Sequence, residues 1–169
     1  DRDVLYALVK TADVGVDNAR PGVAERLGMG YGTLSTMNPR LVYASISGFG
    51  HTGPWSQRPG FDLIAQAMSG ALSATGLPGH EPVKSGIPVA DLGAGLFAAY
   101  GILSALLGRE KSGRGQYIDA SLLEAALGLS VWETTELWGT GKSPQPIGSA
   151  NRMSAPYQAV QGSDGYFVI

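Results

Sequence analysis

Short apolar runs alternate with amphipathic stretches along most of the chain. Residues 1–13 place their apolar side chains on one helical face, and this spacing predicts a helix. Residues 12–18 and 41–46 are apolar runs bounded by turn-forming residues, and each predicts a short buried strand. Residues 20–38, between the two strands, predict helical pieces broken by glycines. This alternation predicts an α/β fold with a mainly parallel sheet.

The second half of the chain carries a longer helical pattern. Residues 61–72 return to helical spacing, and beyond them apolar residues recur every three or four positions at Leu92, Leu96, Tyr100, Leu103 and Leu107. Because alanines and glycines fill the other faces of this second stretch, we expect that helix to be buried on all sides.

A capping box introduces the last helical stretch. Residues 117–121 predict a further strand, and Ser121 with Glu124 forms an S-x-x-E pattern at the start of a helix expected over residues 122–139. From Gly139 the composition shifts to glycine, proline and serine, which predicts a linker. A new strand is expected after the Ser-Asp-Gly turn near the end of the chain.

Composition narrows the classes of function. Hydrophobic residues make up 44% of the 169 residues and charged residues only 15%, so we expect part of the surface to be covered in the complete protein, by oligomerisation or by a further part of the chain. The net charge of −2 gives no electrostatic basis for binding nucleic acid or an anionic membrane. The sequence contains no cysteine, no leader and no segment read as a membrane span, so a cytoplasmic protein is expected. His51 and His80 lie in Gly/Pro loops far from metal-ligand spacing, so we expect solvated histidines and no metal.

One carboxylate, Asp91, stands at the start of the long apolar helix. An ion without a partner in an apolar setting is unfavourable, so Asp91 either caps the helix or takes part in chemistry. Gly93 and Gly95 follow it and weaken the first turn of the helix, whereas they would let a ligand approach the backbone.

A second candidate site follows the first predicted strand. The sequence DNARPG places Asn18 and Arg20 at a strand's carboxyl end, the edge where α/β sheets bind ligands. Arg26 lies further along the next helix, whose first N–H groups would favour a phosphate. A solvated surface turn is the alternative interpretation.

Five stretches in this order, DNARPG, RLVYASISGFGHTGP, RPGFDLIAQAMSG, VADLGAG and REKSGRGQYIDASLLEA, resemble the class III coenzyme A transferases. That family also includes the α-methylacyl-CoA racemases. The resemblance implies a Rossmann-like large domain within an interlocked homodimer. It assigns residues 1–138 to the central part of that domain and residues 139–169 to a linker and the start of a small domain. The chain is therefore expected to be an excerpt of a longer polypeptide.

The resemblance also assigns roles to residues. Asp91 aligns with the family's aspartate, which attacks an acyl-CoA thioester and carries CoA as a covalent intermediate before passing it to a carboxylic acid. Positions that contact CoA, the co-substrate, fall on Asn18, Ala19, Arg20, Arg26 and Leu27, and Phe61 is placed close to the acyl group. Arg26 would pair with a CoA phosphate.

Two departures from the family pattern keep alternatives open. Racemases carry a histidine where this chain has Phe61, and a phenyl ring cannot move a proton, so transfer is favoured over racemisation. Ala19 replaces what is often an aromatic residue beside the adenine, which leaves a CoA-binding pseudoenzyme as a further hypothesis. The acyl group and the acceptor acid are not specified by these residues.

Overall fold

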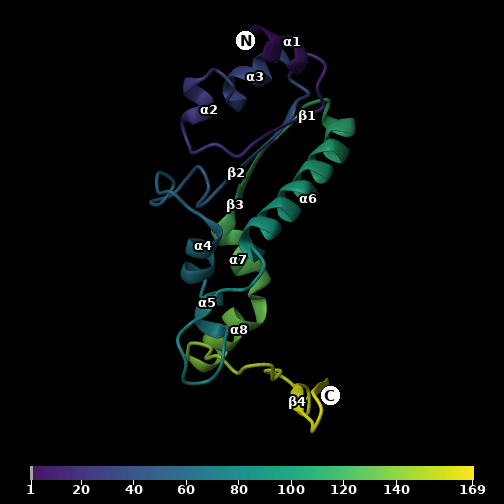
Figure 1. The fold of residues 1–169 in the computed structure, drawn as a ribbon. Helices are drawn as coiled ribbons and strands as arrows, with labels where there is room; N and C mark the ends of the chain where they lie inside the picture. Colours follow the sequence, from purple (N-terminus) through teal and green to yellow (C-terminus); the bar gives the residue numbers. More distant parts are fainter. Residues whose placement is uncertain (1) are drawn as a thin grey trace.

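A three-stranded parallel sheet organises the chain, which the computed structural model describes from residue 2 to residue 169. The strand order is β1-β2-β3, and Figure 1 shows the long helix α6 beside this sheet, with α1, α2 and α3 gathered near one end. The elements are α1 (Arg2–Val9), β1 (Val14–Asp17), α2 (Val23–Arg26), α3 (Tyr31–Met37), β2 (Val42–Ser47), α4 (Asp62–Met68), α5 (Ala71–Ala74), α6 (Val89–Ser112), β3 (Tyr117–Ser121), α7 (Leu122–Leu129), α8 (Val131–Thr140), β4 (Ala159–Gln161) and β5 (Tyr166–Val168). The predicted α/β fold with a parallel sheet is confirmed.

The strand register brings the carboxyl ends of the three strands to one edge. Asp17 of β1 pairs with Ser45 of β2, and Ser47 of β2 pairs with Ser121 of β3. Loops that leave these ends therefore meet at the same edge, where open α/β sheets bind their ligands.

Small side chains build the core beneath this edge. Ala65 of α4, Ala90 and Ala94 of α6, and Ala125 of α7 are buried together with Leu122 and Ala126. Alanines let helix backbones approach closely, so α4, α6 and α7 pack tightly and fix where their first turns lie.

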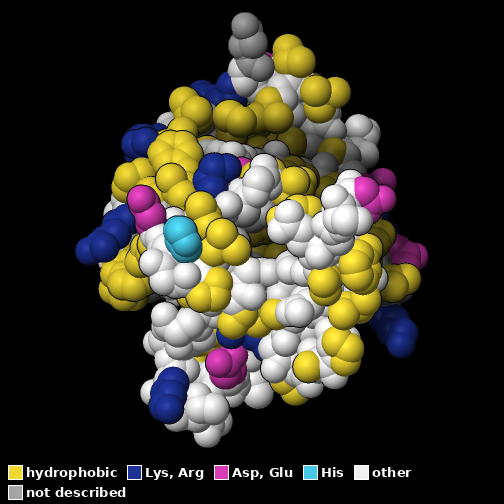
Figure 2. Space-filling model, turned by 60° about the horizontal axis from the view of Figure 1, so that its bottom comes forward, with side chains coloured by type: hydrophobic (Ala, Val, Ile, Leu, Met, Phe, Trp, Pro, Cys, Tyr) yellow, Lys and Arg dark blue, Asp and Glu magenta, His cyan; other side chains and the backbone are white. Residues whose placement is uncertain are grey.

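The expectation that the long helix is buried on all sides is wrong. α6 packs its alanine and glycine face against β2, β3, α4 and α7. The five apolar side chains of the predicted repeat are each more than half exposed: Leu92, Leu96, Tyr100, Leu103 and Leu107. The periodic residues therefore form a second, uncovered face, which we call the α6 stripe. Figure 2 shows one face of the molecule, on which hydrophobic side chains form broad patches with charged side chains scattered among them.

The expectation that no segment has membrane-spanning character is also wrong for α6. Its 24 residues include a window of mean hydropathy 1.6, long and apolar enough to cross a membrane by length and composition alone. A core helix of an α/β protein meets the same criteria, and α6 packs along the sheet in that manner.

Two predicted helices are each divided in two. The stretch 61–72 breaks at Gly70, whose φ of 86° separates α4 from α5. The stretch 122–139 breaks at Ser130, whose hydroxyl donates to the Ala126 carbonyl at 2.8 Å and competes with the helical backbone bonds. The hydrophobic spacing predicted one continuous helix over residues 122–139, whereas the structure divides it at Ser130.

Beyond α8 the chain is irregular until the β4–β5 hairpin. Figure 1 shows this hairpin, in yellow, at the end of an extended segment. Arg152 ties part of that segment to α8 through ion pairs with Glu133 at 3.5 Å and Glu136 at 3.0 Å.

Candidate active site

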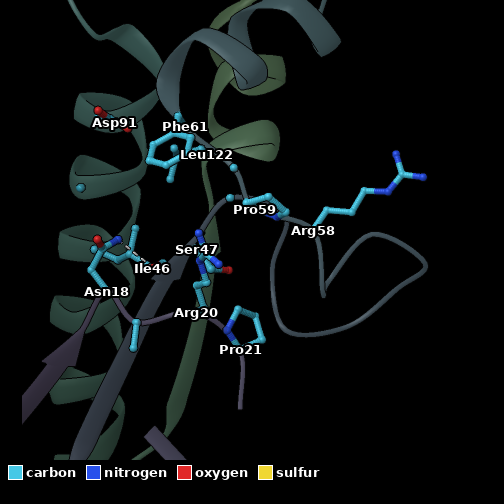
Figure 3. Close-up of a pocket in the computed structure, with 14 residues that line it drawn as sticks. Asn18, Arg20, Pro21, Ile46, Ser47, Arg58, Pro59, Phe61, Asp91 and Leu122 are labelled. Atoms are coloured by element: carbon cyan, nitrogen blue, oxygen red, sulfur yellow. Dashed lines mark hydrogen bonds between the residues drawn. The ribbon is translucent and has the colours of Figure 1, made fainter. Parts of the chain in front are cut away.

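A cavity of about 550 Å³ opens at the carboxyl edge of the sheet. It takes residues from the end of β1, the end of β2, the loop before α4, and the first turns of α6 and α7 (Figure 3). The lining residues are Asn18, Ala19, Arg20, Pro21, Ile46, Ser47, Gly48, Arg58, Pro59, Gly60, Phe61, Asp91, Gly95 and Leu122.

Hydrogen bonds fix the turn that follows β1. The Asp17 carboxylate accepts from the Ala19 N–H at 2.8 Å, and the Asn18 side-chain amide donates to the Ile46 carbonyl at 2.9 Å. The first bond closes a local Asx turn and the second ties the turn to β2. Asn18, Ala19 and Arg20 are thereby held at the cavity wall.

The loop from residue 48 to residue 60 supplies the opposite wall. Gly48 and Gly60 pack backbone to backbone at its base, so closely that a Cβ on either would lie 2.5 Å from the other's Cα. His51 anchors the loop because its Nε2 lies 2.7 Å from the Ser45 hydroxyl oxygen and its backbone N–H donates to the Asp119 carboxylate at 2.8 Å. The expectation of a solvated loop histidine is therefore wrong for His51.

Arg58 is a cationic lining residue that the sequence reading did not identify. Its guanidinium lies 5.5 Å from the Trp55 ring centroid, and Figure 3 shows the side chain extended away from Pro59 and Phe61. Arg20 and Arg58 are the two cationic residues among those that line the cavity, and both are candidates to attract an anionic group of a ligand.

Asp91 is not the cap of α6. The N-cap residue is Pro88, which has no side-chain cap bond, and Asp91 occupies the third helical position. Within residues 2–169 the Asp91 carboxylate accepts no hydrogen bond, and Asp91 lies on the cavity wall. The sequence left two roles open for Asp91, helix cap or chemistry, and this geometry excludes the role of helix cap.

The environment of Asp91 raises the pKa of its carboxyl above the ordinary aspartate value. Partial desolvation at the cavity wall is the larger cause, and the negative charge of Asp62 is the second. The side chain remains exposed overall, so the desolvation is incomplete. A carboxylate with a raised pKa is more basic, and therefore a better nucleophile, than a solvated one.

The two glycines after Asp91 serve different purposes. A Cβ on Gly93 would lie 2.8 Å from the Leu129 side chain, so this glycine permits α6 to pack on α7. Gly95 has nothing within 4 Å of its Cβ position and lines the cavity. Only Gly95 fits the expectation that a missing side chain leaves room for a ligand.

The structure brings most of the expected site residues together. Asn18, Ala19, Arg20, Phe61 and Asp91 share the cavity, and Phe61 is 65% exposed within it. Figure 3 places Phe61 beside the first turns of α6 that carry Asp91.

Arg26 and Leu27 lie outside the cavity lining, at the end of α2, so their contact with CoA stays a prediction. Ser47 and Arg58 line the cavity and were missed, and Asp62 was missed beside Asp91. A polar residue at the end of β2 was a usable signal for Ser47. Asp62 had none, because its partner is 29 positions away.

The edge of the parallel sheet in this α/β protein therefore carries a cavity that is lined by a candidate nucleophile, Asp91, and by two arginines. Sequence comparison is more specific: the model of CoA-transferase family III matches residues 1–169, and the chain belongs to this family.

Named relatives agree with the family assignment. The chain is 44% identical over 171 residues to acetyl-CoA:oxalate CoA-transferase of Acetobacter aceti, covering all of this chain and 44% of the relative. It is 37% identical over 167 residues to human succinyl-CoA:glutarate CoA-transferase, covering 98% of this chain and 38% of the relative. A CAIB/BAIF family protein from Brucella suis superposes with a TM-score of 0.93 at 41% identity, over 99% of this chain and 44% of that structure. The chain thus spans less than half the length of these relatives.

Proposed function

We propose that the protein containing these residues transfers coenzyme A from an acyl-CoA donor to a free carboxylic acid, with Asp91 as the nucleophile. The observation that carries this proposal is the position of Asp91: a carboxylate without a capping role, on the wall of a cavity that also holds Arg20 and Arg58. Two of the relatives named above are CoA-transferases whose names give different acids, which supports the reaction class.

The proposed reaction forms and breaks one acyl bond at each step. A carboxylate oxygen of Asp91 attacks the thioester carbon, the C–S bond breaks, and CoA leaves as a thiolate while an acyl-aspartyl anhydride forms. The thiolate then attacks the aspartyl carbonyl and releases the donor acid, leaving an aspartyl-CoA thioester. The acceptor carboxylate repeats the two steps in reverse order, which yields the new acyl-CoA and restores Asp91.

The cavity walls support this chemistry in separate ways. Arg20 and Arg58 carry the positive charge that CoA phosphates require, and Gly95 leaves room for the thioester beside the first turn of α6. Phe61 offers an apolar surface for the acyl group. Arg26 and Leu27 are further proposed CoA contacts.

Racemisation is the second activity in the wider family, and Phe61 argues against it here. A two-base racemase needs a proton acceptor on each side of the α-carbon, and the phenyl ring of Phe61 accepts none. Incorporation of deuterium from heavy water into the α-carbon of an acyl-CoA would support racemisation, whereas exchange of CoA between acids supports transfer.

We also propose that the α6 stripe is covered in the complete protein, which we expect to be an interlocked homodimer. Leu92, Leu96 and Leu107 would be stabilised by contact with a further part of the chain or with a second copy. This proposal agrees with the low proportion of charged residues in the sequence.

The activity is tested with the full-length protein. Isotopically labelled acids from a panel are incubated with an unlabelled acyl-CoA, and label entering the thioester pool is measured for the wild type and for Asp91→Asn. Transfer by the wild type and none by the variant supports the proposal. Equal transfer by both proteins would overturn the role of Asp91, and CoA binding without transfer to any acid would favour the pseudoenzyme.

A further inference from the structure

The first turn of α6 is capped by a residue of another helix. Asp62, the first residue of α4, accepts from the Ala90 N–H at 2.8 Å and from the Asp91 N–H at 3.3 Å through its Oδ1. Pro88 offers no side-chain bond of its own. Asp62 therefore replaces the missing cap and contacts the backbone of the residue that carries the candidate nucleophile.

A buried amide holds Asp62 in this position. The Gln66 side chain is 1% exposed, and its Nε2 donates to the Asp62 Oδ2 at 2.6 Å. Its Oε1 accepts from the Ser85 N–H at 2.8 Å, in the segment that leads into α6. Gln66 thus joins α4 to the segment before α6, and both oxygens of Asp62 have assigned partners.

We propose that Asp62, locked by Gln66, is a positioning residue for Asp91: it fixes the first turn of α6 and sets the charge around the Asp91 carboxylate. This inference rests on the proposed function, because positioning has consequences for transfer only if Asp91 is the nucleophile. Nothing in the local sequence around Asp91 reveals the arrangement.

The charge effect has a definite sign. The negative charge of Asp62 disfavours ionisation of Asp91, so it contributes to the raised pKa of that carboxyl. Arg20 and Arg58 are the other charged residues lining the cavity, while Ile46 and Ser47 of β2 and Leu122 of α7 carry no charge. Removing the charge of Asp62 therefore lowers the pKa of Asp91 and makes its carboxylate less basic.

Two variants separate charge from geometry. In Asp62→Asn combined with Gln66→Glu, the new amide keeps the acceptor for the Ala90 N–H and donates to the new carboxylate, which also accepts from the Ser85 N–H. Every hydrogen bond is conserved while the negative charge moves one turn along α4, away from Asp91. Gln66→Leu does the opposite, since it keeps the charge of Asp62 and removes the lock.

The control is Glu110→Gln. It removes one carboxylate charge from α6 at the far end of the helix, where Glu110 is exposed and pairs with Arg40 at 3.4 Å. Thermal unfolding of each full-length variant shows whether it folds.

The experiment measures kcat and KM of the full-length protein as functions of pH. For the double variant we expect the acid limb of kcat to move to lower pH and kcat at neutral pH to fall several-fold, with KM for acyl-CoA unchanged. For Gln66→Leu we expect kcat to fall by up to about a hundredfold through misplacement of the nucleophile. If the double variant shows the same kcat–pH profile as the control Glu110→Gln, the inference is overturned.

A second readout is independent of turnover. Carbodiimide modifies protonated carboxyl groups, so the pH dependence of Asp91 labelling without acyl-CoA reports its ionisation directly. A labelling profile moved to lower pH in the double variant supports the inference, and an unmoved profile overturns it. Should the wild type show no transfer at all, the proposed function fails, while the labelling profile still decides whether Asp62 tunes Asp91.

Discussion

The first turns of α6 and α7 carry an acid at the same helical position, and the two acids have opposite surroundings. Glu124 is the third residue of α7, as Asp91 is of α6. The hydroxyl of Ser121 accepts from the Glu124 N–H at 3.1 Å and donates to its carboxylate at 2.8 Å. Pro88 of α6 has no such group, and Asp62 supplies the cap from a distance.

The different caps of α6 and α7 explain why Glu124 has a hydrogen-bond partner in its own helix cap and Asp91 does not. A helix that caps itself through its own sequence binds its first-turn acid, and that acid becomes structural. A helix capped from elsewhere leaves its acid without an intrahelical partner. Glu124 and Asp91 are thus distinguished by the residue three positions earlier, a serine in one case and a proline in the other.

The largest expected effect comes from removing the carboxylate of Asp91, and the same change at Glu124 is the comparison. Asp91→Asn should lower kcat for CoA transfer by at least about 10³-fold, because the nucleophile is lost while the cap of α6 stays in place. Glu124→Gln should leave kcat within about twofold, since Glu124 belongs to the capping box. Steady-state kinetics of the two full-length variants check this, and a large loss in both would erase the distinction between the acids.

The pH dependence of transfer sharpens the comparison. Only the ionised carboxylate of Asp91 attacks, so kcat should fall about tenfold per pH unit below the pKa of Asp91. Because burial and Asp62 raise that pKa, the fall should begin above the value of about 3.9 typical of a free aspartate. A kcat–pH profile that stays flat down to pH of about 4 would contradict the raised pKa.

Two glycines of α6 form a matched pair, because Gly93 contacts α7 and Gly95 lines the cavity. Gly93→Ala should lower the free energy of unfolding by about 1–3 kcal/mol, because its Cβ would meet Leu129. Gly95→Ala should not destabilise the protein, since its Cβ faces open space, but it should raise KM for acyl-CoA by narrowing the cavity. Chemical denaturation and kinetics separate the two, and equal destabilisation by both would contradict the packing described here.

The smallest effect is expected from the cap of α7. Ser121→Ala removes the acceptor of the Glu124 N–H and should lower the free energy of unfolding by about 1 kcal/mol, with kcat unchanged. Thermal unfolding and transfer assays measure both quantities. A loss of kcat with normal stability would give α7 a catalytic role that its geometry does not explain.

Features set by neighbouring residues were predictable from the sequence. The strands around residues 14–17 and 42–47 and the capping box at Ser121 each depend on a few consecutive side chains, and all are found. The turn after β1 was predictable as well, because Asn and Asp side chains close such turns locally.

Features set by distant contacts were not predictable. The exposure of the α6 stripe depends on which face of α6 packs against β2, β3, α4 and α7. Within the site, Asp91 was identified as a lone carboxylate at the start of an apolar helix, and the family resemblance supplied its expected role. Asp62 and Gln66 could be identified only from the packing of α4 on α6. The hydrophobic pattern of the sequence does not predict the hydrogen bond from the Ala90 N–H to the Asp62 carboxylate.

Trapping the covalent intermediate tests the central claim most directly. Full-length protein is incubated with acyl-CoA and hydroxylamine, digested, and mapped by mass spectrometry. The account predicts a hydroxamate on Asp91 that requires acyl-CoA, with Glu124 unmodified in the same sample. An enzyme that transfers CoA while Asp91 stays unmodified, or one modified at Glu124 instead, would contradict it.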